Sequence, residues 1–330
     1  MAAFIIRRLL LGIVTLWALT IVTFVIIQLP PGDFVDAYVA QASAMGSAIS
    51  AAEAAAMRQA YGLDQPLWVQ YVKWVSLISR GQFGLAFEYG RPVKEVIGDR
   101  LWLTIVISLA ALIVTWALAL PIGIYSAVRQ YSIGDYFFTF LGFIGLAVPN
   151  FLLALIILYL GFKYLGINVG GLFSPEYELA PWSWGKVWDL AKHVPVPAII
   201  LALAGTAQLV RIMRANLLDE LRKPYVVTAR ARGLPERRVI MKYPVRAALN
   251  PFASTIGYLL PFIVSGSIIV SVVLSLPTVG PLLLRALVAQ DMLLASTIIM
   301  LLGVLTVIGT FISDLLLMWI DPRIRQGLHG

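Results

Sequence analysis

Residues 101–128 read LWLTIVISLAALIVTWALALPIGIYSAV and contain no Lys, Arg, Asp or Glu. A helix rises about 1.5 Å per residue, so this stretch exceeds the roughly 20 residues that cross a bilayer core about 30 Å thick. The whole chain has the same character, because 60% of its 330 residues are hydrophobic and only 13% are charged. A soluble domain carries about 25% charged residues. The sequence therefore predicts a membrane protein rather than two soluble domains.

Five further stretches are apolar enough to be considered as membrane spans. Four are long, and only the last of them holds a charged residue, Asp314: these are residues 9–29, 136–162, 251–276 and 292–320. The fifth, 198–210, is short, and its length alone argues against a span. The basic residues that follow it nevertheless indicate that it is a span.

Positive charge is concentrated between residues 211 and 246, where ten of the 25 basic residues lie. Loops near spans that carry excess Lys and Arg stay on the cytoplasmic side. With six spans, this loop, Arg7 and Arg8, and the basic C-terminal tail all face the cytoplasm. Without 198–210 as a span, the loop and the tail would face outward. The predicted fold class is therefore an all-α polytopic membrane protein with six transmembrane helices, both termini cytoplasmic, and a large outer loop after the first helix.

This orientation also accounts for the net charge of +8, so nucleic-acid binding is not needed to explain it. Arg7 and Arg8 before an apolar run would also fit a cleaved secretory signal. The run is longer than the roughly 7–15 residues of a signal core, and no small-x-small cleavage pattern follows it at once. We therefore expect an uncleaved membrane anchor.

The charge and hydropathy pattern divides the chain into three parts. Residues 1–29 form the N-terminal segment and first span, 30–100 an outer loop with short helices, and 101–330 a core of five spans that includes the inner loop 211–250. In the outer loop, Ser50 and Glu53 have the spacing of a capping box, and Gly62 is placed to end the helix that follows.

Aromatic residues recur every three positions in the outer loop, at Trp68, Tyr71 and Trp74. Such a row favours a helix seated at the membrane interface, because Trp and Tyr are enriched there. A role in stacking against a substrate is the alternative.

The inner loop 211–250 is cut into short pieces by prolines. Pro224 precedes, and Gly233 and Pro235 follow, a segment that should form a helix of about two turns over 225–232. A helix this short is marginal in water, so other residues must hold it. It either packs against the membrane-spanning bundle or docks into a separate cytoplasmic subunit.

The chain offers few groups for catalysis. It has no cysteine, and its two histidines, His193 and His329, lie in an outer loop and at the C-terminal tail. No nucleotide-binding P-loop, zinc helix or nucleophile elbow occurs. We expect a non-enzymatic chain with no catalytic residue, no metal site and no cofactor of its own, and any ATP to be bound by another chain.

Polar and proline residues within or next to the spans are the candidates for a pathway. An acid at the centre of a span costs about 2.5–3.5 kcal/mol, but Asp314 is only six residues from Ile320, roughly 9 Å from the inner end, so it is expected either to form a structural ion pair or to relay protons. Prolines in spans free backbone carbonyls and mark kinks. The candidate gate or pathway residues are Pro149, Ser265, Ser267 and Asp291.

These features resemble a known family, the inner-membrane permease subunits of ABC importers, and within it the dipeptide, oligopeptide and nickel group. The resemblance runs almost end to end. The matching segments are PGD at 31–33, YGLDQPL at 61–67, QY at 70–71, GQFG at 81–84, RPV at 91–93, TARARGLP at 228–235 and DPRIR at 321–325. The segment 228–235 is the most specific, because it is similar to the loop through which such permeases contact their ATPases.

The resemblance implies a type I ABC importer permease fold in the bacterial inner membrane. Its implied partners are a second homologous permease, two cytoplasmic ATPases that bind ATP and Mg²⁺, a periplasmic substrate-binding protein and the lipid bilayer. The residues implied to couple this chain to an ATPase are Tyr225, Val226, Thr228, Ala229, Arg230, Arg232, Gly233, Leu234 and Pro235.

The sequence departs from the family pattern mainly near the last outer loop. Ser271, Leu274 and Thr278 stand where the group commonly has an acid, Phe and Gly, and Gln82 stands where Asp is more usual. The expected function is half of the pathway of a peptide importer. Nickel or another small solute is the alternative substrate, and an ion-gradient-driven transporter that uses Asp314 is the alternative mechanism.

Overall fold

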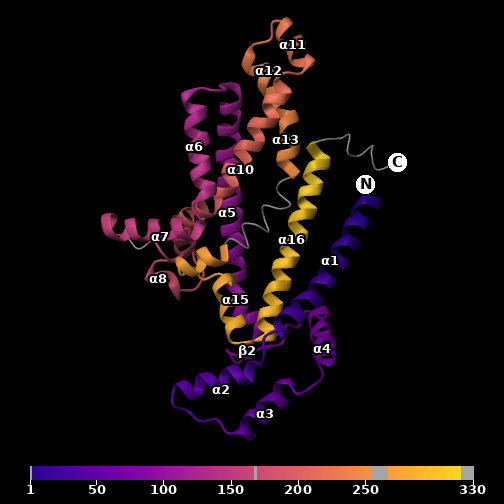
Figure 1. Cartoon of the computed structure of the whole chain (residues 1–330), viewed down its shortest axis with the longest axis vertical. Helices are drawn as coiled ribbons and strands as arrows, with labels where there is room; N and C mark the ends of the chain where they lie inside the picture. Colours follow the sequence, from indigo (N-terminus) through magenta and orange to yellow (C-terminus); the bar gives the residue numbers. More distant parts are fainter. Residues whose placement is uncertain (1, 167–168, 255–266, 321–330) are drawn as a thin grey trace. The chain divides into compact units, whose positions relative to one another are not determined.

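The structure is a computed structural model that describes residues 2–166, 169–254 and 267–320. Apart from one pair of short strands, the regular elements among these residues are helices (Figure 1). They form two compact units. The N-terminal unit comprises Ala2–Leu103 with Thr278–Val307, and the central unit comprises Thr104–Pro277 with the residues from Ile308 onward. Helices α5 and α16 contribute to both.

The N-terminal unit contains one long apolar helix and several short ones. Its elements are α1 (Ala2–Gln28), α2 (Phe34–Ala44), α3 (Ala51–Tyr61), α4 (Leu67–Ser79), β1 (Leu85–Ala86), β2 (Arg91–Pro92), the start of α5 (Val93–Val128), α15 (Val279–Val288) and the start of α16 (Met292–Ile320). The strands are antiparallel, with Leu85 opposite Pro92 and Ala86 opposite Arg91.

Local capping explains where the short helices of the outer loop begin and end. The predicted capping box of α3 is confirmed: the Ser50 side chain accepts from Glu53 N, and Glu53 accepts from Ser50 N. Gly62 ends α3 in the left-handed conformation at φ 69°. A second box, between Asp33 and Asp36, begins α2. Sequence reasoning did not find it.

Helix α4 packs against α1 through aromatic side chains. Trp74 is only 1% exposed and clusters with Phe24 and Met292, and the hydroxyls of Tyr71 and Thr20 lie 3.0 Å apart. Protein covers the Trp74 ring, so Trp74 itself does not contact lipid; that α4 lies at the membrane interface stays a prediction. Trp68 is 70% exposed.

The central unit is built around α10. Its elements are the remainder of α5, α6 (Ile133–Ala147), α7 (Asn150–Leu160), a π-helical turn η1 (Gly161–Leu165), α8 (Pro175–Glu178), α9 (Trp184–His193), α10 (Pro195–Leu221), α11 (Pro224–Ala231), α12 (Glu236–Lys242), α13 (Pro244–Ser254), helical residues 267–273 and the end of α16. Helix α10 packs on α6, α7 and α13 (Figure 1). Buried Leu209, Met213 and Leu217 form the centre of this core with Ala119 of α5 and Ile240 of α12.

Four described helices are long and apolar enough to cross a membrane: α1, α5, α10 and α16. The short stretch 198–210 is part of the 27-residue α10, which is long enough to cross a membrane, and this supports the prediction that the stretch is a span. The stretch 136–162 is not one straight helix, because α6 and α7 meet at an angle of 101° at Pro149. Most of the predicted span 251–276 lies outside the described residues.

The surface of α1 is what a lipid-facing helix requires. Leu10, Ile13 and Trp17 are each 58–63% exposed, and further large apolar side chains along α1 are exposed as well. Monomeric soluble proteins rarely show a contiguous apolar surface of this extent. The membrane protein predicted from composition is therefore confirmed in its coarse features, as a helical chain with several apolar spans.

Candidate functional site

The candidate site is the loop that leaves α10 and returns through α13. Helix α11 has Pro224 in its first turn, where the missing amide hydrogen costs nothing. It ends at Ala231, and Gly233 follows with φ 75°, a left-handed conformation that glycine adopts without strain. The helix predicted over 225–232 is therefore confirmed to within one residue at each end.

One side of α11 is buried within the loop itself. Val226 is 0% and Ala229 7% exposed, and they form a cluster with buried Val239 of α12 and half-buried Leu234. Pro235 occupies the N-cap position of α12, where its carbonyl accepts from Arg238 N at 2.8 Å. The turn at Gly233 thus folds α12 back onto α11, and this supplies the packing that a two-turn helix needs.

Two polar contacts fix the ends of α11. At its C-terminal end, Arg230 donates to both carboxylate oxygens of Glu236, with Nη2 2.6 Å from Oε1 and Nε 3.1 Å from Oε2. At its N-terminal end, Glu220 of α10 accepts from Lys223 Nζ at 2.6 Å and from the Tyr225 hydroxyl. Helix α11 is therefore held to α12 within the loop and to α10.

These contacts shift the pKa values of the groups that make them, including Glu236 and Tyr225. Hydrogen bonds from the Arg230 guanidinium hold the pKa of Glu236 below its usual range. Partial burial, together with the hydrogen bond to Glu220, raises the pKa of Tyr225. Both groups consequently keep a fixed charge near neutral pH, with Glu236 ionised and Tyr225 neutral.

The opposite face of α11 is exposed. Val227 is 58% and Tyr225 38% exposed, and Thr228 and Arg232 are also exposed. Six basic residues and one acidic residue lie between 222 and 238. The site therefore presents small apolar and hydroxyl groups surrounded by positive charge, a surface suited to an acidic partner.

The structure brings all nine predicted coupling residues together, but in two different roles. Those that hold the loop are Val226, Ala229, Arg230, Gly233, Leu234 and Pro235. Those with an exposed side chain are Tyr225, Thr228 and Arg232, of which Tyr225 also holds the loop through its hydrogen bond to Glu220. Sequence reasoning missed Glu220, Glu236 and Val239, although the acids flanking a cationic helix were a signal that could have found two of them.

A buried ion pair connects α10 to α6 near the site. Asp135, which is 2% exposed, accepts from Arg214 Nε at 2.9 Å and Nη2 at 2.8 Å. Its second oxygen also accepts from the backbone of Tyr131, which lies at φ 61° in the turn between α5 and α6. The α5–α6 turn is thereby fixed to the helix that leads into α11.

The candidate gate residues fall in different places. Pro149 lies at the 101° break between α6 and α7, as a kink-forming proline should. Ser267 is buried in the central unit, and Ser265 lies outside the described residues. Their role as a gate stays a prediction.

Asp291 lies in the N-terminal unit, where it begins α16. Its Oδ1 accepts from Leu294 N at 3.1 Å, and its Oδ2 accepts from Glu88 N at 3.2 Å. The carboxyl is fully buried, and burial raises its pKa to about 6. These contacts make Asp291 a link between α16 and the outer loop, and its part in a pathway stays a prediction.

Several long apolar helices, joined by a loop that contains a basic two-turn helix with one exposed face, define a polytopic membrane protein. The chain belongs to the binding-protein-dependent transport system inner membrane components, whose family model matches residues 119–326. The corresponding N-terminal family model, described as "Binding-prot-dependent transport system membrane comp, N-term", matches residues 1–110. The loop 211–250 lies wholly within the first match.

Several curated proteins are similar over nearly their whole length. The oligopeptide transport system permease protein AppB of Bacillus subtilis is 37% identical, covering 98% of this chain and all of AppB. A putative peptide permease of Brucella ovis is 34% identical over 98% of this chain and 99% of its own length. The dipeptide transport system permease protein DppB of Lactococcus lactis is 30% identical over 98% of this chain and all of DppB.

Proposed function

We propose that this chain is a permease subunit of an ATP-driven importer of di- and oligopeptides and forms half of the translocation pathway. The family match and the relatives named as peptide permeases support this function. The observation that carries the ATP-driven part is α11, a short helix held rigidly on one face and exposed on the other.

The proposed partners follow from this function. A second homologous permease supplies the other half of the pathway, and a periplasmic binding protein delivers the peptide. Two cytoplasmic ATPases bind ATP and Mg²⁺, and one of them receives the exposed face of α11. The chain lies in the bacterial inner membrane with six spans and both termini in the cytoplasm, so that the ten basic residues between 211 and 246 face the cytoplasm.

The geometry suggests how force would pass from an ATPase to the membrane helices. A partner can shift a conformational equilibrium only as far as its contacts differ between the two states, so the element it moves must not deform. Within the loop, the Val226 cluster and the Arg230–Glu236 pair hold α11 to α12. Lys223 and Tyr225 bind Glu220 of α10, and Arg214 binds Asp135 of α6. Movement of α11 would therefore carry α10 and α6 with it.

The test is to purify the chain from its own membranes in mild detergent, identify the co-purifying subunits, and reconstitute the assembly in liposomes. We expect two ATPases and a second permease, and uptake of a labelled dipeptide that requires ATP and the binding protein. Uptake by the isolated chain without ATP, or an assembly that carries no ATPase, would contradict the proposal.

A further inference from the structure

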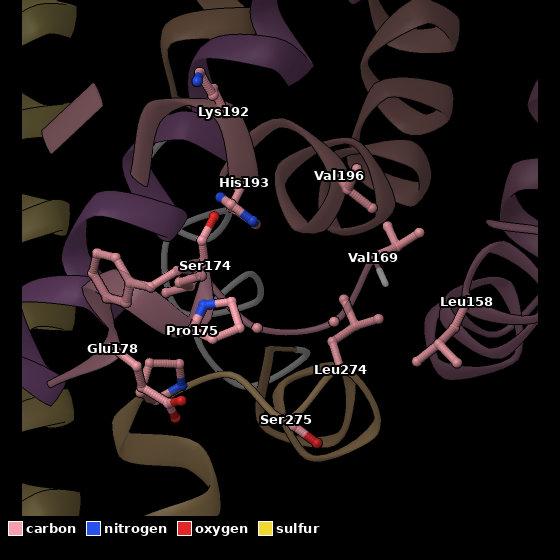
Figure 2. A pocket seen from close by; sticks show the side chains of 15 residues that line it. Leu158, Val169, Ser174, Pro175, Glu178, Lys192, His193, Val196, Leu274 and Ser275 are labelled. Carbon is pink, nitrogen blue, oxygen red and sulfur yellow. The ribbon is translucent and has the colours of Figure 1, made fainter. Parts of the chain in front are cut away.

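A second site lies in the outer loop between α7 and α10, away from the coupling loop. It is a cavity of about 700 Å³, within the size range of pockets that hold small organic ligands (Figure 2). Its walls are mostly apolar and include Leu158 of α7, Leu172, Val196 of α10 and Leu274. The polar groups among its lining are few, which is the composition expected of a site that binds an organic solute.

A buried carboxylate keeps one wall of this cavity in place. Asp189 of α9 is 6% exposed and accepts from Ser174 N at 2.7 Å and from Ser174 Oγ at 2.8 Å. These bonds lower the pKa of Asp189 despite its burial, so the carboxylate stays ionised. The cavity wall around Ser174 is therefore preformed, and a ligand need not order it on binding.

His193 is oriented by the same helix. Its Nδ1 lies 2.8 Å from the backbone carbonyl of Asp189, which can only accept, so Nδ1 carries the hydrogen. The other ring nitrogen, Nε2, is then a hydrogen-bond acceptor in the neutral form. Figure 2 shows the His193 ring turned toward the hollow, with Glu178 below it and the Lys192 side chain directed upward, away from the hollow.

Glu178 and Lys192 give the lining of the cavity one acidic and one basic residue. Both side chains are exposed, and the Lys192 ammonium lies 5.9 Å from the Trp188 ring centre. An exposed contact of this kind is weak, so a carboxylate can compete for the ammonium. An apolar hollow lined by one acidic and one basic side chain is complementary to a short peptide, which has an ammonium at one end and a carboxylate at the other.

We propose that this cavity is a peptide subsite of the permease, in which Glu178 receives the peptide's N-terminal ammonium, Lys192, on leaving Trp188, its C-terminal carboxylate, and the apolar walls its side chains. This inference rests on the proposed function and adds a place where this chain itself contacts the peptide. It assigns the recognition of the two peptide ends to residues in the loop 163–197.

The first experiment measures peptide binding to the permease complex purified without its binding protein. Labelled trialanine is compared with N-acetyl-trialanine and with trialanine amide. We expect Glu178→Gln to weaken the binding of trialanine about fivefold, the scale of an exposed ion pair, while leaving N-acetyl-trialanine unchanged. Lys192→Gln should do the same for peptides with a free carboxylate and leave the amide unchanged. Glu176→Gln, in the same short helix but outside the cavity lining, is the matched control and should change nothing.

The second experiment locates the ligand. The chain has no cysteine, so Ser275→Cys, at the cavity wall, introduces a unique thiol into this subunit. Trialanine should slow its reaction with a maleimide, read on this subunit by mass spectrometry, and should not protect a thiol introduced at exposed Ala191. No protection would overturn the subsite. So would a Ser275→Cys thiol that reacts in the isolated chain but is blocked in the complex without peptide, because a partner subunit would then fill the cavity.

The outcomes for the subsite and for the proposed function are separable. If the complex imports dipeptide with ATP but Glu178→Gln and Lys192→Gln bind every peptide normally, the subsite is wrong and the permease function stands. If the wild-type complex imports no peptide, the proposed function itself is wrong.

Discussion

Val226 and Val227 are adjacent, identical residues of α11, one on its buried side and one on its exposed side, and they separate the two roles of this helix. Val226 is 0% exposed in the cluster with Ala229 and Val239, and Val227 is 58% exposed. Val→Ala removes two methyl groups, each worth about 0.8 kcal/mol when buried. With part of the resulting cavity left open, Val226→Ala should cost about 2 kcal/mol. Val227→Ala should cost almost nothing.

The cost should appear locally, because an isolated two-turn helix is marginal and the cluster supplies most of its stability. If α11 opens separately from the bundle, about 2 kcal/mol corresponds to about 30-fold faster amide hydrogen exchange across 226–231. Hydrogen exchange followed by mass spectrometry on the detergent-solubilised chain measures this directly. Unchanged exchange in Val226→Ala, or equal acceleration in Val227→Ala, would refute the assignment of the two faces.

For ATPase binding, the exposed Val227 should matter more than the buried Val226. Val227→Glu places a negative charge on the exposed face and should reduce co-purification of the ATPase without changing hydrogen exchange in the isolated chain. Val226→Ala should leave co-purification largely intact but reduce the uptake obtained per ATP hydrolysed, because the helix yields instead of transmitting movement. If Val227→Glu retains full ATPase binding and uptake, α11 does not dock through this face.

Three further perturbations follow from the structure. Gly233 has φ 75°, a conformation that costs other L-residues about 1–2 kcal/mol. Gly233→Glu should therefore abolish uptake and its coupling to ATP hydrolysis while membrane insertion stays normal, and Gly233→Asn should retain most uptake. Equal loss of uptake in both variants would argue against the backbone as the cause. Arg214→Ala leaves the buried Asp135 carboxylate without its guanidinium and should lower the free energy of unfolding by about 3 kcal/mol, measured in detergent, whereas the exposed Arg246→Ala should have little effect. Burial, and to a lesser degree the charge of Glu88, raises the pKa of Asp291 from an ordinary 3.8 to about 6 in the folded chain. The folded state therefore holds this proton more tightly than the unfolded state, and the free energy of unfolding should fall by up to about 3 kcal/mol as pH rises from about 4 to about 6. Comparing wild type with Asp291→Asn across this range isolates the effect, and an identical pH dependence in both would contradict it.

Helix α11 was predictable because its limits are set by local backbone chemistry. Pro224 begins α11, Gly233 ends it, and Pro235 caps the next helix, and each acts through its own allowed dihedral angles. The same holds for Ser50, Glu53 and Gly62 around α3. What the helix packs against was not predictable from its sequence alone, because Val239 reaches it only after the chain turns back at Gly233.

The errors and omissions arise where distant residues decide the outcome. Helix α10 continues through Arg211 and Arg214 to Leu221, beyond the apolar stretch, and a hydropathy pattern cannot register that Asp135 of α6 neutralises Arg214. Periodicity places Trp68, Tyr71 and Trp74 on one row but does not reveal that α1 covers Trp74. A proline at 149 predicts a kink, but the 101° angle depends on how α7 packs.

The same reasoning applies to the outer cavity. Glu178, Lys192 and His193 are unremarkable in sequence, as ordinary residues of an aromatic-rich loop. They line one cavity with Gly171 and Leu274, whose backbones are joined by a hydrogen bond of 2.7 Å from Gly171 N to the Leu274 carbonyl across about a hundred residues. Ser174 and Asp189 complete this wall across a shorter separation. Local patterns cannot predict such pairings.

The most direct test of the account is a cross-link from the exposed face of α11. Because the chain has no cysteine, Thr228→Cys introduces a single thiol on that face, and Val226→Cys introduces one on the buried face. A short thiol-reactive cross-linker applied to the assembly in its own membranes should join Thr228→Cys, but not Val226→Cys, to a cytoplasmic ATPase. Labelling of Thr228→Cys by a membrane-impermeant reagent from outside the cell, with no cross-link to an ATPase, would contradict it.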